Sequence, residues 1–119
     1  MPTVLIVEDE LMVREIAVAE FEDSGFCVLE ADDGAAALAH LAAGAIDVLF
    51  TDIRLPGVID GWHIARRARE LNPDLPVIYA TGFSGSDQLQ IVPGGRFITK
   101  PYLPTAIVAV ARELVAKAN

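Results

Sequence analysis

Acidic residues follow two short apolar runs of the chain. Residues 4–7 lead directly into Glu8 and Asp9, and the largely apolar run 46–51 leads to Asp52. Runs of this kind are typical of buried strands, and in an open parallel sheet the carboxyl ends of the strands surround the ligand site. Clustered carboxylates raise one another's pKa unless a cation neutralises them, and their hard oxygen atoms suit Mg²⁺. The sequence therefore predicts an acidic, magnesium-binding pocket at one edge of a sheet.

Two further polar residues follow later apolar runs. Thr81 comes after the run 76–80, and Lys100 comes after the short run 97–99. An aspartate such as Asp52 can attack phosphorus and form an acyl phosphate, while Mg²⁺ neutralises the phosphoryl oxygens. A lysine then supplies a fixed positive charge, and a threonine hydroxyl can donate a hydrogen bond. Together these strand ends predict a site that receives a phosphoryl group.

Strand-like and helix-like segments alternate along the chain. This alternation predicts an α/β fold, a doubly wound parallel sheet with helices on both faces. The expected strands span residues 3–7, 26–30, 46–51, 76–80 and 97–99; the expected helices end before Gly25, Gly44 and Asn72, and the last spans 103–118. The fourth helical position is weak, because only residues 87–92 could be helical. We expect a short, frayed or absent helix there.

Four motifs at these strand ends resemble the receiver domain of two-component response regulators, the CheY-like family. They are Val7-Glu8-Asp9, Thr51-Asp52-Ile53-Arg54-Leu55-Pro56-Gly57, Ala80-Thr81-Gly82 and Thr99-Lys100-Pro101, in the family's order and approximate spacing. The resemblance implies a flavodoxin-like five-stranded sheet with strand order 2-1-3-4-5. It also implies that residues 1–119 form a single receiver domain.

The resemblance assigns roles in the acidic pocket. Asp52 would be the phosphoacceptor and would also bind Mg²⁺. Asp9 would bind the cation directly, Glu8 would bind it through a water molecule, and Arg54 would bind it through its backbone carbonyl. Glu8 stands where the family more often has aspartate, but its longer side chain can still reach a metal-bound water.

The resemblance also implies a conformational switch. Thr81 and Lys100 would contact the phosphoryl group, and Phe97 holds the position of the family's switch aromatic. Phosphorylation would draw Thr81 toward the phosphoryl oxygens and turn Phe97 inward. The face formed by the fourth helix, the fifth strand and the last helix would then be remodelled, as a shift between two populations. The Lys100–Pro101 peptide bond would be cis.

Two segment lengths depart from the usual family pattern. The loop after Asp52 reaches Gly61 one residue late, as in receivers associated with hybrid sensor kinases. The interval from Thr81 to Lys100 is short, as in single-domain receivers with a degenerate fourth helix. These features predict an altered output face.

The resemblance implies a signalling module rather than an enzyme, with at most Mg²⁺-dependent self-phosphorylation from small donors and autodephosphorylation. Its phosphodonor would be a sensor histidine kinase or a histidine phosphotransfer protein, and its output would be contact with a downstream protein. One alternative is a receiver that takes no phosphate and acts as a scaffold. An aspartyl phosphohydrolase is disfavoured because Arg54, two residues after Asp52, cannot act as acid and base. A flavin or nucleotide binder is disfavoured because Glu8-Asp9-Glu10 would repel phosphate.

Composition limits the partners and the compartment. The chain has 119 residues and a formal net charge of −8, which argues against direct nucleic-acid binding and against docking on an anionic membrane. Its one cysteine, Cys27, cannot form an internal disulfide, and we detect no signal peptide or membrane-spanning run. We therefore expect a cytoplasmic protein.

Two apolar features of the helices give further expectations. The last helix carries Val108 and Val115 away from its main apolar stripe, which favours a homodimer or a docking surface there. Trp62, at the start of the third helix, is expected to be partly exposed.

Overall fold

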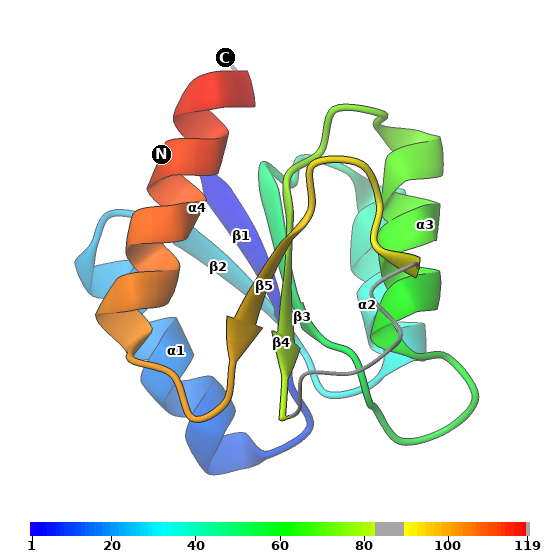
Figure 1. Ribbon diagram of the computed structural model, residues 1–119, viewed down its shortest axis with the longest axis horizontal. Helices are drawn as coiled ribbons and strands as arrows, with labels where there is room; N and C mark the ends of the chain where they lie inside the picture. Colours follow the sequence, from blue (N-terminus) through cyan, green and yellow to red (C-terminus); the bar gives the residue numbers. More distant parts are fainter. Residues whose placement is uncertain (83–89, 119) are drawn as a thin grey trace.

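The computed structural model describes residues 1–82 and 90–118. Within them, five parallel strands form one sheet in the order β2-β1-β3-β4-β5, which confirms the predicted fold class and strand order. Figure 1 shows helices on both sides of the sheet. The strands are β1 (Thr3–Val7), β2 (Cys27–Ala31), β3 (Val48–Asp52), β4 (Val77–Thr81) and β5 (Arg96–Thr99); the helices are α1 (Leu11–Asp23), α2 (Gly34–Ala43), α3 (Gly61–Leu71) and α4 (Pro104–Ala118).

Each face of the sheet carries its own apolar core. Side chains alternate along a strand, so that successive residues enter opposite cores. Leu5 and Tyr79 pack in the core with α2 and α3, whereas Ile6 and Ile78 pack in the core with α1 and α4. All four side chains are fully buried. A sheet covered on both faces leaves its strand ends as the natural places for polar chemistry.

Three strands begin and end one or two residues later than the sequence indicated. Strand β2 ends at Ala31, β3 at Asp52 and β4 at Thr81. An apolar run marks buried side chains, but the backbone pairing between strands continues past the end of the run. Val7 pairs with Ala31, and Asp52 pairs with Ala80. Asp52 and Thr81 therefore lie within strands, where the sheet restrains their backbones.

Helix α3 begins directly against the end of β3. Asp60 caps the helix by accepting a hydrogen bond from the His63 backbone N–H at 2.9 Å. The Gly61 N–H donates to the Ile53 carbonyl at 2.7 Å, which folds the intervening loop back on itself. A Cβ atom at position 61 would overlap the backbone oxygen of Asp52. Only glycine therefore allows this close approach.

Replacing Gly61 with alanine is expected to lower the free energy of unfolding by about 2–3 kcal/mol, because the added methyl group must displace packed backbone. Gly82→Ala is the matched control, since no atom of the described residues lies within 4 Å of a Cβ placed there. Its effect should stay within about 0.5 kcal/mol. Urea denaturation measures both, and equal stability of the two variants would contradict the steric account.

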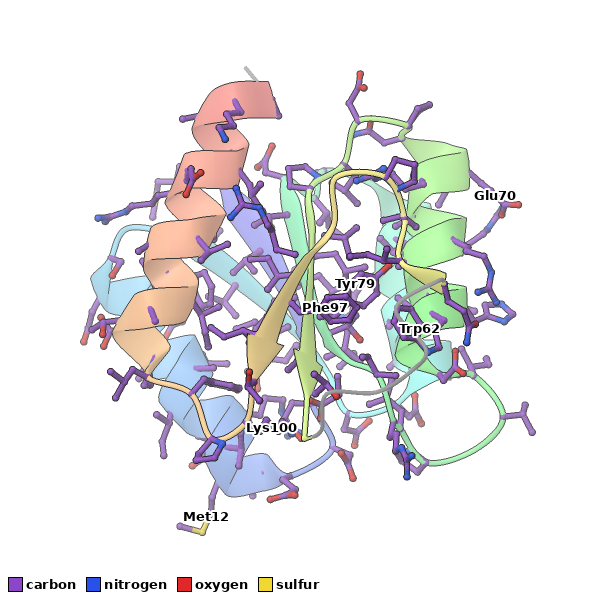
Figure 2. All side chains as sticks on the ribbon, viewed as in Figure 1. Met12, Trp62, Glu70, Tyr79, Phe97 and Lys100 are labelled. Atoms are coloured by element: carbon purple, nitrogen blue, oxygen red, sulfur yellow. The ribbon has the colours of Figure 1, made fainter. Side chains whose placement is uncertain are left out.

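Trp62 is buried, so the expectation of partial exposure was wrong. Its side chain is 4% exposed, and its ring centroid lies 4.8 Å from that of Tyr79 and 5.9 Å from that of Phe97. Figure 2 shows these three aromatic side chains together, contributed by α3, β4 and β5. The helix start alone did not reveal that two strands supply aromatic partners for the indole.

Val108 also differs from expectation, because it is buried in the core between α4 and the sheet. Val115 is partly buried against the same core. The homodimer through the last helix stays an untested prediction and loses this apolar support. The first half of the short helix expected at residues 87–92, residues 87–89, lies outside the described part of the chain. Across residues 1–82 and 90–118, no helix combines the length and apolar composition that a membrane span requires.

Candidate functional site

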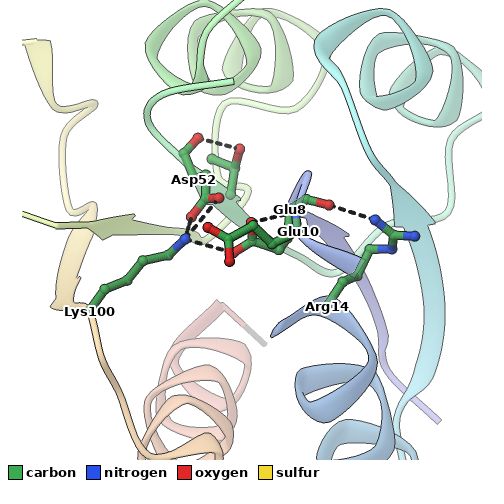
Figure 3. Close-up of polar contacts among 6 residues, drawn as sticks. Glu8, Glu10, Arg14, Asp52 and Lys100 are labelled. Atoms are coloured by element: carbon green, nitrogen blue, oxygen red, sulfur yellow. Dashed lines mark hydrogen bonds and ion pairs between the residues drawn. The ribbon is translucent and has the colours of Figure 1, made fainter. Parts of the chain in front are cut away.

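Glu8, Asp52 and Lys100 meet at the carboxyl edge of the sheet, each from a different strand end (Figure 3). Glu8 and Asp52 are buried, with 2% and 5% of their surfaces exposed. The Lys100 Nζ lies 2.7 Å from Glu8 Oε1 and 2.9 Å from Asp52 Oδ1. One lysine therefore neutralises part of the charge on two buried carboxylates.

Asp9 completes a cluster of carboxylates at this edge. One carboxylate oxygen from each of Glu8, Asp9 and Asp52 lies within 4.8 Å of the others, and Asp9 is exposed to solvent. All of these donors are hard oxygens, and Mg²⁺ is commonly held by one or two carboxylates with water and phosphate completing its shell. The donor set fits Mg²⁺, with Asp9 on the open side of the cluster.

Backbone contacts fix the orientation of the site. Glu8 Oε2 accepts from the Glu10 N–H at 3.0 Å, and the Thr51 hydroxyl donates to the Asp52 carbonyl at 2.8 Å. The Lys100 N–H donates to the Thr81 carbonyl at 2.8 Å, which joins β5 to β4 directly at the site. The Lys100–Pro101 peptide bond is cis.

Asp52 has a strongly perturbed ionisation. Burial, reinforced by a hydrogen bond with Glu8, raises the pKa of Asp52 to about 8, although Lys100 opposes the shift. The carboxyl therefore competes for a proton near neutral pH when no cation is bound. A metal ligand must be deprotonated, so cation binding and loss of this proton are linked.

Glu8 and Lys100 are shifted toward their charged forms. Burial alone would raise the pKa of Glu8, but hydrogen bonds with Asp52, Lys100 and the Glu10 backbone outweigh it and lower that pKa. Burial likewise opposes the charged form of Lys100, yet the two carboxylates raise the pKa of its ammonium. The site therefore favours the neutral form of Asp52, whose pKa is raised, and the charged form of Glu8, whose pKa is lowered.

The remaining predicted site residues lie around this cluster. Thr81 ends β4, half-buried and paired with Thr99 of β5. Arg54 is exposed in the loop that follows β3. Phe97 is partly buried in β5, and its ring centroid lies 5.4 Å from that of Tyr79. Thr81 and Lys100 thus share one strand pair beside Asp52, and Phe97 faces the aromatic core behind them.

Arg14 is a site neighbour that the sequence analysis did not identify. Its guanidinium Nη1 donates to the Glu8 carbonyl at 2.8 Å, and its Nε donates to Glu30 Oε1 at 3.0 Å. The side chain is 14% exposed. A basic residue on the first turn of the helix after an acidic loop was the signal available in the sequence.

An apolar groove of about 450 Å³ adjoins the cluster. It lies between the start of α1 and the segment after β5, and is lined by Glu10, Val13, Ile16, Lys100, Pro101, Tyr102 and Pro104. Tyr102 packs edge-on against Phe50, with ring centroids 5.5 Å apart, and burial raises the pKa of its hydroxyl to about 12. Ile16, which lines the groove, is 57% exposed, and Leu103, in the segment after β5, is 71% exposed.

This topology places a buried aspartate at the end of β3 and a lysine directly after β5, at the same edge of one five-stranded parallel sheet. A family model for the response regulator receiver domain matches residues 4–112, and the chain therefore belongs to that family. The family consists of signalling modules of two-component systems.

Comparisons with individual proteins agree with this assignment. The chain is 38% identical to the response regulator receiver protein CpdR of Brucella abortus over 84 residues, which cover 71% of this chain and 69% of CpdR. It is 35% identical to the aerobic respiration control protein ArcA of Escherichia coli over 119 residues, which cover 98% of this chain. It spans 49% of the length of ArcA.

Solved structures show the same fold. A crystal structure of a response regulator receiver protein from Sinorhizobium medicae superimposes with a TM-score of 0.94 at 31% identity, covering 99% of this chain and 97% of that one. The receiver domain of the hybrid histidine kinase CckA superimposes with a TM-score of 0.82 at 30% identity, covering 95% of this chain and 98% of that one.

Proposed function

We propose that residues 1–119 act as one cytoplasmic receiver unit that accepts a phosphoryl group on Asp52. The donor is the phosphohistidine of a sensor histidine kinase or a histidine phosphotransfer protein, and the result is altered contact with a downstream protein. One observation carries the proposal: the buried Asp52 carboxylate lies 2.9 Å from the Lys100 ammonium, within a cluster of three carboxylates. This pairing offsets the repulsion between an anionic nucleophile and an anionic phosphoryl group.

The transfer is a displacement at phosphorus. An ionised Asp52 oxygen forms the new O–P bond as the P–N bond of the phosphohistidine breaks, and the imidazole leaves with the electron pair. Lys100 is placed to neutralise one phosphoryl oxygen, and the Thr81 hydroxyl can donate to another. Mg²⁺ held by Glu8, Asp9, Asp52 and the Arg54 carbonyl would supply further positive charge for the phosphoryl oxygens.

Phosphorylation changes the partners of Lys100 and Thr81. Lys100 is engaged by Glu8 and Asp52 in the unmodified protein and must turn toward the phosphoryl oxygens. Thr81 moves toward the same oxygens, and Phe97 adjusts on the neighbouring strand. Strands β4 and β5 and helix α4 then present a different surface to the downstream protein, as a population shift.

The apolar groove beside Lys100 supports a protein as the phosphodonor. Exposed apolar patches that are rimmed by polar residues commonly mark sites of protein contact. Leu11, Met12 and Ile16 of α1 and Leu103 before α4 are all more than half exposed. A donor protein that covers this groove would place its phosphohistidine over Asp52.

Ile16→Asp is expected to slow phosphoryl transfer from a phosphorylated histidine phosphotransfer protein by roughly tenfold or more, because it puts a charge into an apolar contact. Uptake from a small donor such as phosphoramidate should not change. Leu71→Asp is the control, since Leu71 is 47% exposed at the far end of α3. Equal slowing with both donors would contradict a docking role for the groove.

Intact mass tests the central proposal. Wild type and Asp52→Asn are incubated with Mg²⁺ and phosphoramidate, with and without a chelator. One added phosphoryl group in the wild type only, and only with Mg²⁺, is the expected result. Absence of an adduct in the wild type would sink the phosphoacceptor proposal and favour the scaffold alternative. An adduct on Asp52→Asn would show that another residue is modified.

A further inference from the structure

Arg14 connects the acidic cluster to the edge strand β2. Its guanidinium is mostly buried, although arginine is ordinarily solvated. Nη1 donates to the Glu8 carbonyl at 2.8 Å, a contact drawn in Figure 3, and Nε donates to the Glu30 carboxylate at 3.0 Å. The two contacts use different edges of one rigid, planar group.

We propose that Arg14 is a positioning residue that sets the Glu8 carboxylate for cation binding; the inference rests on the proposed function of the site. Both backbone groups of Glu8 are held, the N–H by the Ala31 carbonyl at 3.0 Å and the carbonyl by Arg14. The side chain then leaves from a fixed backbone and engages the Lys100 ammonium at 2.7 Å.

Electrostatics alone gives the opposite expectation for Arg14. A guanidinium beside an acidic cluster repels a second cation, so its removal would strengthen Mg²⁺ binding. Positioning predicts weaker binding instead, because the Glu8 backbone carbonyl would lose its anchor. The sign of the change in affinity therefore separates the two accounts.

A lysine at position 14 separates geometry from charge in a second way. Lysine keeps the positive charge but presents one compact ammonium, which cannot reproduce the planar fork that joins Glu8 to Glu30. If Arg14 acts by positioning, the Mg²⁺ affinity of Arg14→Lys should resemble that of a neutral variant such as Arg14→Met. If Arg14 acts through its charge, the Mg²⁺ affinity of Arg14→Lys should resemble that of the wild type.

The test is calorimetric titration of metal-free protein with Mg²⁺ for the wild type, Arg14→Met and Arg14→Lys. We expect both variants to bind Mg²⁺ about tenfold more weakly, the usual scale for residues that orient metal ligands. Tighter binding by Arg14→Met, or unchanged binding by Arg14→Lys, would overturn the proposal.

Two controls keep the result interpretable. Arg67→Lys alters an exposed arginine that pairs with Glu70 at 3.2 Å on α3, and its Mg²⁺ affinity should match the wild type. Thermal melting identifies a temperature at which every variant is folded, and the titrations are run there. A lowered melting temperature with unchanged Mg²⁺ affinity would contradict the proposal and leave Arg14 with a structural role only. Phosphoryl uptake by the wild type is scored separately, so that failure of the proposed function is distinguishable from failure of this inference.

Discussion

Asp52→Asn is expected to stabilise the metal-free protein at pH 8 by about 2 kcal/mol, or roughly 6–10 °C in melting temperature. Burial raises the pKa of Asp52 from its ordinary 3.8 to about 8. Between these values the folded state binds more protons than the unfolded state, so stability falls as pH rises. Asparagine does not titrate and escapes this loss. We expect much less than the full linked energy because Asp9 leaves one side of the cluster open to water.

The pH profile is the decisive measurement for this prediction. Thermal melts in a chelator at pH 5 and pH 8 should show a larger gain for Asp52→Asn at pH 8, where the wild-type carboxyl has lost more of its proton. Asp74→Asn, at an exposed turn position, is the matched control and should change little at either pH. Parallel profiles for wild type and Asp52→Asn would show that Asp52 does not control the pH dependence.

Lys100→Met is expected to have the opposite effect, a loss of about 3 kcal/mol of stability at pH 8. Lys100 is the cation within 3 Å of both Glu8 and Asp52, and its removal leaves two buried carboxylates facing each other. Phosphoryl uptake from a small donor should fall by roughly a hundredfold or more, because no fixed charge meets the phosphoryl oxygen.

Added Mg²⁺ provides an internal check on that interpretation. Because the cation can replace part of the missing positive charge, Mg²⁺ should raise the melting temperature of Lys100→Met more than that of the wild type. Lys117→Met is the control, since Lys117 is 65% exposed and pairs with Glu113 on the surface. The prediction fails if the two lysine variants have equal stability and equal responses to Mg²⁺.

The place of the cluster could be predicted from the sequence for a physical reason, whereas the strand order followed from the resemblance to receivers. In a parallel sheet every carboxyl end lies at the same edge, so polar residues that follow apolar runs must converge there. Glu8, Asp52, Thr81 and Lys100 each occupy such a position, although they are distant along the chain. The only further requirement was to recognise each run as a strand.

Features that depend on packing between elements could not be predicted in this way. Trp62 is buried because Tyr79 and Phe97 happen to face it across α3, β4 and β5. Arg14 reaches both Glu8 and Glu30 because α1 packs against both β1 and β2. Val108 looked peripheral on a helical projection, but α4 buries a wider face than its main stripe. Local periodicity carries no information about such neighbours.

The missing side chain at position 61 has a mechanical consequence. Helix α3 approaches the Asp52 carbonyl directly at Gly61, with no side chain between them. The hydrogen bond from Gly61 to Ile53 stabilises this contact. We therefore expect Asp52 and α3 to move together as one rigid unit. If Asp52 accepts a phosphoryl group as proposed, the resulting displacement would fall on β4 and β5, where Thr81 and Phe97 lie. Under the proposed function, the protein would be anchored on its α3 side and would respond through β4 and β5.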